Sequence, residues 1–308
     1  MARIGWAQLP PDLRRRVERV AGAEVREAQT QTGGFSAGIA SRVTFADGQR
    51  LFVKAVPTTS EGTFELYLRE AEVLRAIPRD LPAAHLVDAF SQDDWTVLVI
   101  EDVEGRHPER SASSADTAHV LDAIAALATV PTDHQLPRLS AELADDARSW
   151  SRLVTEGLLE TTTPWCVANV DLLRAAAERV PSAVAGDRLL HADLRADNIL
   201  IDSSGRARLL DWPWAARGAG WEDALLYLLD LRVEDSTADV APLLDHPAFG
   251  ISRTDDHVAL LAAVAGSWFE KCRLPAPPGM TTLRDFQRRE AIAAVEWIAQ
   301  LSGSHSAR

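Results

Sequence analysis

Residues 189–214 decide the fold. They read Leu189-Leu-His-Ala-Asp-Leu-Arg-Ala-Asp-Asn-Ile-Leu-Ile-Asp202 and, after a short turn, Ala207-Arg-Leu-Leu-Asp-Trp-Pro-Trp214. Apolar pairs flank the polar residues on both sides, which is typical of short buried strands that end in a polar loop. The pattern predicts a strand that leads to His191 and Asp193, and a hairpin that returns the chain to Asp211. These groups, with Asn198 at the start of the hairpin, would lie on adjacent strand ends and be able to bind a metal ion or accept a proton.

The spacing His191-x-Asp193-x-x-x-x-Asn198, followed by Asp211, resembles the catalytic loop and metal-binding aspartate of the protein-kinase-like superfamily. More narrowly, it resembles the aminoglycoside phosphotransferase and choline kinase family. In that family Trp or Phe follows the second aspartate, as Trp212 does here, and the first motif lacks the arginine of protein kinases. The resemblance implies an α+β, two-lobed protein-kinase-like fold, with a small antiparallel-sheet N-lobe and a larger, mostly helical C-lobe.

Further matches follow in the family's order along most of the chain. They are Gly33-Gly-Phe-Ser36 (nucleotide loop), Val53-Lys54 (strand lysine), Leu68-Arg-Glu-Ala-Glu-Val-Leu74 (helix with the ion-pair glutamate), Leu98-Val-Ile-Glu-Asp-Val-Glu-Gly105 (hinge) and Gly220-Trp-Glu-Asp-Ala-Leu225 (downstream aspartate motif). The shared order, more than any single match, carries the resemblance.

The resemblance implies a role for each residue of the central motif. Phosphoryl transfer depends on in-line placement and on neutralising the charge of the transferring oxygens. Asp193 would orient the acceptor hydroxyl and take its proton. Asn198 and Asp211 would bind Mg²⁺, which prefers oxygen ligands and also takes phosphate oxygens.

Lysine usage singles out Lys54. Of the 32 basic residues 30 are arginines, and the only lysines are Lys54 and Lys271. The compact ammonium of a lysine suits a phosphate oxygen in a tight site. By the resemblance, Lys54 would contact the α- and β-phosphates and be held by a helix carboxylate, expected to be Glu70, with Glu65 and Glu72 as alternatives.

The resemblance also assigns the remaining nucleotide contacts. Main-chain N–H groups around Gly34, Phe35 and Ser36 would cradle the phosphates. Main-chain groups of Glu101 and Val103 would receive the base. The nucleotide is expected to be ATP, with GTP as the alternative.

The other polar and aromatic residues near the motif are expected to be structural. His191 is expected to pack against the loop and hydrogen-bond it, and Asp223 to brace the loop without touching substrate. Turn or surface roles are expected for Arg195, Asp197 and Asp202. Core packing is expected for Trp212, Trp214 and Trp221, with a stacking wall for the acceptor as the alternative.

Periodicity predicts the elements of each lobe. Residues 1–103 are predicted to form the nucleotide-binding lobe, with helices at 10–28 and 61–77, strands around Phe45 and Lys54 and at 85–91 and 95–101, and a hinge at about 100–105. Residues 104–308 are predicted to form the helical lobe that holds the catalytic loop (189–214) and the substrate site, with helices at 115–130, 140–160, 170–180, 255–270 and 284–302.

Composition narrows the class of protein. The net charge of -13 argues against general nucleic-acid binding, which calls for a basic stripe. The two cysteines, Cys166 and Cys272, provide neither a disulfide framework nor a cysteine-based zinc site. The N-terminus lacks the apolar core of a signal peptide, and the apolar stretch 258–269 is too short to span a bilayer. We therefore expect a soluble, cytoplasmic protein; nothing in the sequence indicates its oligomeric state.

The expected activity is ATP-dependent transfer of a phosphoryl group to a hydroxyl of a small molecule, most readily an aminoglycoside-like or other antibiotic. Residues 104–308 carry 20 basic and 30 acidic side chains, which would suit a cationic acceptor. A metabolic kinase with a choline-, homoserine- or sugar-type acceptor is the alternative. A protein kinase is disfavoured because no Ala-Pro-Glu element follows Asp211, and a nucleotide-binding pseudokinase because it would not require Asp193.

Overall fold

The structure is a computed structural model that describes residues 4–31, 38–60, 62–132, 136–277 and 280–303. The N-terminal part is an antiparallel five-stranded sheet in the order β1-β2-β3-β5-β4. Its strands are β1 (Val25–Thr30), β2 (Ile39–Phe45), β3 (Arg50–Pro57), β4 (Leu86–Gln92) and β5 (Trp95–Glu101). Lys54 lies opposite Ala40 of β2 and Leu98 of β5, and therefore on the central strand.

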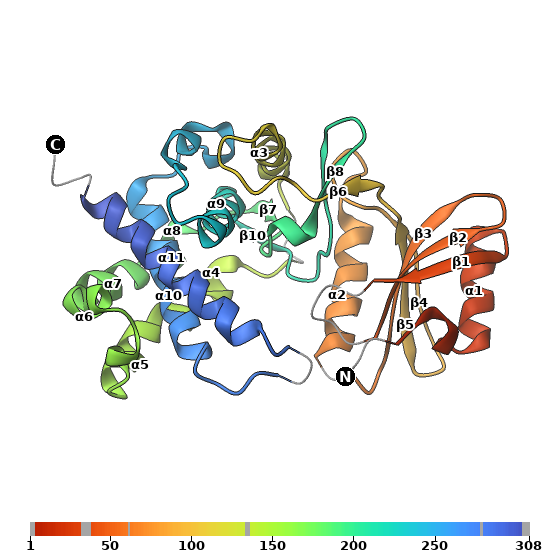
Figure 1. Ribbon diagram of the computed structural model, residues 1–308, viewed down its shortest axis with the longest axis horizontal. Coiled ribbons are helices and arrows are strands. Elements are labelled where there is room, and N and C mark those ends of the chain that lie inside the picture. The colour runs from red at the N-terminus through yellow and green to blue at the C-terminus, as the bar shows by residue number, and fades with distance from the viewer. Residues whose placement is uncertain (1–3, 32–37, 61, 133–135, 278–279, 304–308) are drawn as a thin grey trace.

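Side chains alternate across β3, as they must in a strand. Leu51 and Val53 are buried in a small core that α1 (Pro11–Ala21) covers on the outer face of the sheet. Lys54 points to the opposite face, toward α2 (Thr63–Ala76). Figure 1 shows α2 lying between the sheet and the helical body. The sheet therefore presents its lysine to the space between the two lobes.

The molecule has two cores of unequal size. The smaller one lies between α1 and the outer face of the sheet. The larger one fills the helical body and extends across α2 to the inner face of the sheet, where it includes Val56, Tyr67, Leu74 and Ile100. By its packing, α2 is thus part of the larger core.

The first helix is shorter than predicted. The expected helix at 10–28 ends at Ala21, because Gly22 adopts a left-handed conformation (φ 78°) and its N–H donates to the Glu18 carbonyl. Residues 25–30 instead form β1, an edge strand paired with β2. The prediction of one continuous helix here was wrong.

The C-terminal part is mostly helical and surrounds the long, buried helix α10 (Figure 1). Its helices are α3 (Ala115–Ala128), α4 (Leu139–Glu142), α5 (Ser149–Thr155), α6 (Pro164–Ala168), α7 (Val170–Ala177), α8 (Val180–Ala183), α9 (Glu222–Glu234), α10 (Thr254–Lys271) and α11 (Leu283–Gly303). Within the described residues, none of the helices has the length and apolar character needed to cross a membrane. The predicted α+β, two-lobed arrangement is confirmed.

Two of the predicted helices are broken. The segment 140–160 forms α4, a 3-10 turn and α5, and Gly157, at φ 67°, follows the end of α5. The segment 170–180 divides into α7 and α8 because Pro181, at the start of α8, has no N–H to continue the preceding helix.

Two small sheets hold the central motif. One consists of β6 (Gly105–Arg106), β8 (Ile199–Asp202) and β9 (Ala207–Leu209), and the other of β7 (Arg188–Leu190) and β10 (Ala216–Gly218). The strand before His191 therefore pairs with β10, and the hairpin that leads to Asp211 belongs to the other sheet. Leu209 of β9 donates its N–H to Pro82 (2.7 Å) and accepts from Ala84 (3.2 Å), which ties β9 to the loop after α2.

Candidate active site

Lys54 stands at the centre of a cluster of charges between the lobes. Its Nζ lies 2.7 and 2.8 Å from the two carboxylate oxygens of Glu70 in α2, and 2.5 Å from Oδ1 of Asp211. The Glu70 side chain is 1% exposed, whereas that of Asp211 is 48% exposed. Of the three candidate glutamates, Glu70 is thus the one that pairs with Lys54, and Asp211 has an open side.

Burial and mutual attraction compete in this cluster. Burial would lower the pKa of Lys54, but the carboxylates of Asp211 and Glu70 outweigh it and raise that pKa. Burial also opposes ionisation of Asp211, yet Lys54 holds its pKa below the usual range. For Glu70 burial prevails over the attraction of Lys54 and raises the pKa, and the nearby negative charge of Asp211 adds to the rise. The lysine therefore stays charged at neutral pH.

Asp193 and Asn198 adjoin this cluster on the loop between β7 and β8. The amide Nδ2 of Asn198 donates to the main-chain oxygen of Asp193 (2.9 Å) and to its Oδ2 (3.2 Å), so the Asn198 side-chain oxygen points away from this pair. Leu210 donates its N–H to the Asn198 carbonyl at 2.9 Å, which places Asn198 beside Asp211. Burial raises the pKa of Asp193 to about 6, against the opposing effect of Arg195.

Asp223 and His191 brace the loop, as predicted. The 1%-exposed Asp223 accepts the N–H groups of His191 (2.7 Å) and Ala192 (2.8 Å). The His191 ring, fully buried against Trp212, lies 2.8 Å from the Leu210 carbonyl through Nε2 and accepts the Asp193 N–H through Nδ1 (3.3 Å). Burial lowers the pKa of His191 to about 4, so the ring is neutral and links the two catalytic segments.

The hydrogen bonds from His191 and Ala192 to Asp223 hold a strained stretch of backbone. Ala192 and Asp211 both adopt positive φ, 62° and 65°. This conformation costs a non-glycine residue about 1–2 kcal/mol and persists only where surrounding contacts enforce it. At Ala192 the enforcing contact is the carboxylate of Asp223.

We expect Asp223→Ala to destabilise the protein by about 2–5 kcal/mol, because it leaves two buried N–H groups without an acceptor. Urea unfolding followed by circular dichroism would measure the loss. Asp197→Ala is the matched control, since the Asp197 side chain is 46% exposed. Its partner Arg195 is only 20% exposed and also lies 3.6 Å from Asp193, so the surface role predicted for Arg195 was wrong. Equal stability of the two variants would contradict the bracing role.

The other residues of the motif occupy mixed environments. Asp202 accepts from the N–H groups of Ser204 (2.9 Å) and Arg206 (3.1 Å), which confirms it as a turn aspartate. Trp212 and Trp221 are buried as expected, whereas Trp214 is 46% exposed. Only Trp214 of the three is therefore open to a molecule outside the core.

The predicted nucleotide contacts are only partly described. Gly34, Phe35 and Ser36 lie outside the described residues. Glu101 donates its N–H to the His85 carbonyl (2.8 Å). The candidate contact of Glu101 with the base is therefore the Glu101 carbonyl. The Val103 carbonyl accepts a hydrogen bond from Nη2 of Arg42 (3.5 Å). The candidate contact of Val103 with the base is therefore its main-chain N–H.

Two features near the site were missed by sequence reasoning. The side chain of Asp102, directly after β5, is buried between Arg42 and Arg50. Helix α11 brings the ring of Phe286 within 5.5 Å of the Arg195 guanidinium. No sequence signal joins these residues, since they come together only in the folded chain.

A divalent cation fits the donors at Asn198 and Asp211. Among the described residues no group of three or more His, Cys, Asp or Glu side chains is arranged to hold a metal. Mg²⁺ needs no such group, because it typically binds through one or two protein carboxylates together with phosphate oxygens and water. The amide oxygen of Asn198 and the half-exposed carboxylate of Asp211, on segments joined by the hydrogen bond from Leu210 to the Asn198 carbonyl, match that requirement.

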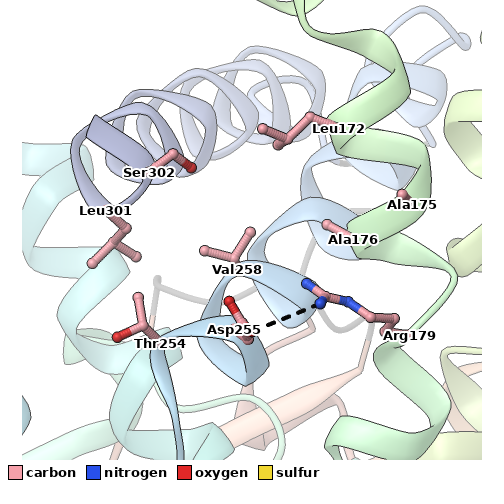
Figure 2. A pocket seen from close by; sticks show the side chains of 9 residues that line it. All are labelled: Leu172, Ala175, Ala176, Arg179, Thr254, Asp255, Val258, Leu301 and Ser302. Carbon is pink, nitrogen blue, oxygen red and sulfur yellow. Dashed lines mark ion pairs between the residues drawn. The ribbon is translucent and has the colours of Figure 1, made fainter. Parts of the chain in front are cut away.

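A separate cavity of about 410 Å³ lies in the helical lobe, between α7, the start of α10 and the end of α11 (Figure 2). It is mainly apolar, and Arg179 and Asp255 form an ion pair at 3.9 Å beside it. The charged cluster around Lys54 contributes none of its lining. We therefore give this cavity no part in the chemistry.

A sheet lobe that presents a paired lysine to a braced loop of aspartate and asparagine defines a protein of the kinase-like class. The profile of the phosphotransferase enzyme family, APH, matches residues 32–257. The chain belongs to this family. No curated protein sequence matches it significantly.

Solved structures of similar fold include small-molecule kinases. An aminoglycoside phosphotransferase from Alicyclobacillus acidocaldarius has 13% identity and a TM-score of 0.60, over 92% of this chain and 93% of that one. Choline kinase LicA from Streptococcus pneumoniae has 15% identity and a TM-score of 0.58, over 94% and 99%. Amicoumacin kinase hAmiN has 13% identity and a TM-score of 0.55, over 93% and 94%. At these identities the similarity establishes the kinase-like fold.

Proposed function

We propose that the protein transfers the γ-phosphate of ATP to a hydroxyl of a small molecule, most readily an aminoglycoside-like or other antibiotic. The observation that carries the proposal is the Lys54–Glu70–Asp211 cluster beside Asp193 and Asn198. A buried, charged lysine, an aspartate with an open side and a second aspartate on a fixed loop are the groups that phosphoryl transfer requires.

In this proposal Asp193 orients the acceptor hydroxyl and takes its proton. Its raised pKa makes it a better proton acceptor than an ordinary aspartate. Lys54, fixed by Glu70, binds the α- and β-phosphates. Asn198 and Asp211 hold Mg²⁺, which supplies positive charge to the phosphate oxygens when bound.

The nucleotide is proposed to lie between the lobes, with its base at Glu101 and Val103 and its phosphates near Gly34, Phe35 and Ser36. The hAmiN complex contains AMP-PNP and Ca²⁺, which supports binding of a nucleotide with a divalent cation. We propose ATP, with GTP as the alternative. We also propose the lobe boundary at residues 100–105 and a cytoplasmic location.

The acceptor is proposed to be a small, cationic molecule. Aminoglycoside and choline kinases among the similar structures support a small, cationic acceptor. Two acidic residues that would attract it are already paired, Asp145 with Arg152 (3.0 Å) and Asp146 with Lys271 (3.4 Å). Exposed Trp214 is a better candidate for contact with an acceptor. A metabolic kinase with a choline-, homoserine- or sugar-type acceptor stays the alternative, and a pseudokinase is the less favoured one.

The test is Mg·ATP consumption against a panel of aminoglycosides, other hydroxyl-bearing antibiotics, choline, homoserine and amino-sugars. We expect turnover with one class of compound, loss of turnover in EDTA and its return with excess Mg²⁺. Turnover with choline or homoserine alone would favour the metabolic kinase. Nucleotide binding without turnover on any acceptor would favour the pseudokinase, and failure to bind nucleotide would reject the proposal.

A further inference from the structure

The carboxylate of Asp102, on the segment that joins the lobes, is held by two arginines. Its side chain is 2% exposed. Arg50 of β3 donates from Nε to Oδ2 (2.9 Å), and its Nη2 lies 2.7 Å from the same oxygen. Nε of Arg42, in β2, lies 3.2 Å from Oδ1. Both oxygens of this buried carboxylate thus have a cationic partner.

The two arginines belong to the same face of the sheet as Lys54. Side chains that are two residues apart on a strand point to one face, so Arg50, Phe52 and Lys54 share a face of β3. Arg42 lies directly opposite Phe52 on β2 and therefore on that face too. Arg50 and Lys54 are four residues apart, or about 13 Å. One face of β3 thus carries Lys54 at one end and Arg50, which binds Asp102, at the other.

Glu101, the residue before Asp102, contacts the C-terminal lobe. The carboxylate of Glu101 accepts a hydrogen bond from Nη2 of Arg208 in β9 at 2.8 Å. The same Glu101 oxygen also accepts the His85 N–H (3.3 Å), so the Glu101 carboxylate contacts both lobes, whereas Asp102 is held by the two sheet arginines. The main chain between them is fixed from both sides.

We propose that Asp102 is a positioning residue for nucleotide binding: gripped by Arg50 and Arg42, it fixes the main-chain groups of Glu101 and Val103 that receive the base. The inference rests on the proposed function, because it needs a nucleotide between the lobes. Arg42 supports it directly, since its Nη2 also reaches the Val103 carbonyl at 3.5 Å. Main-chain groups that hydrogen-bond a base are selective for that base only when the donor and the acceptor are held in place.

The test compares ligands with and without a base. Binding of ATP, adenosine and inorganic tripolyphosphate is measured by calorimetry for the wild type, Asp102→Asn, Arg50→Gln and Arg50→Lys. We expect Asp102→Asn and Arg50→Gln to weaken ATP and adenosine roughly tenfold and to leave tripolyphosphate unchanged. Arg50→Lys, which keeps the charge but loses the contact through two nitrogens, should recover part of the affinity. The KM for ATP should rise in the same variants while kcat changes less than about twofold.

Arg15→Gln is the matched control, because Arg15 makes an exposed ion pair with Asp12 on α1. Thermal melting of each variant shows whether it folds. If Asp102→Asn does not fold, the binding data for Arg50→Gln decide the test. Equal losses for adenosine and tripolyphosphate, or no loss for either, would overturn the positioning role while leaving the kinase proposal intact. A wild type that binds none of the three would reject the proposed function and this inference with it.

Discussion

Asp193→Asn is expected to lower the rate of phosphoryl transfer by about 10²–10⁴-fold, the range for loss of a general base. The substituted amide keeps the shape of the side chain but cannot take the hydroxyl proton. The main-chain oxygen of Asp193, which also accepts from Asn198, is unchanged by the substitution. Binding of Mg·ATP should therefore stay within a few-fold of wild type, as measured by calorimetry beside a steady-state assay.

The control for this variant is Asp197→Asn, four residues further along the same loop. Asp197 is half-exposed and pairs with Arg195, so its neutralisation should change the rate by less than about tenfold. If Asp193→Asn retained most of the activity, or if Asp197→Asn proved equally damaging, the assignment of Asp193 as the base would be wrong.

Lys54→Met is expected to abolish transfer and also to destabilise the protein by about 3–5 kcal/mol. The reason for the second effect is Glu70, whose side chain is 1% exposed and would be left as an uncompensated buried charge. Replacing both partners, Lys54→Met with Glu70→Leu, should restore most of the stability and none of the activity. Urea unfolding and the transfer assay together separate the two effects.

The only other lysine of the chain provides the matched control. Lys271 is 48% exposed and lies 3.4 Å from Asp146. Lys271→Met should cost less than about 1 kcal/mol and leave transfer unchanged, as for other exposed ion pairs. A double variant at Lys54 and Glu70 that stayed as unstable as Lys54→Met would refute the account of the buried pair.

Local sequence patterns predicted the central motif well because its parts are close in the chain. The run from His191 to Asp211 contains its own strands and turn, and the buried Asp223 brace follows a recognisable pattern. The pairing of Lys54 with a helix glutamate was implied by the family resemblance, and the structure selects Glu70 over Glu65 and Glu72.

The predictions that went wrong depended on tertiary context. The predicted helix at 10–28 included residues 25–28, but a left-handed Gly22 ends α1 and these residues form part of β1, which pairs with the edge of β2. The grip of Arg42 and Arg50 on Asp102 joins residues more than fifty positions apart. Scattered arginines give no periodic signal, and this chain has 30 of them.

The extension of the larger core across α2 has a consequence for how the chain can be divided. A fragment ending near residue 103 would keep the sheet and the small core under α1, but it would uncover Tyr67, Leu74 and Ile100. The complementary fragment would lose the partners of Leu209 at Pro82 and Ala84. The same strands supply side chains to both cores, Val53 to the small one and Val56 to the large one, so we expect the two lobes to unfold together and not as independent units.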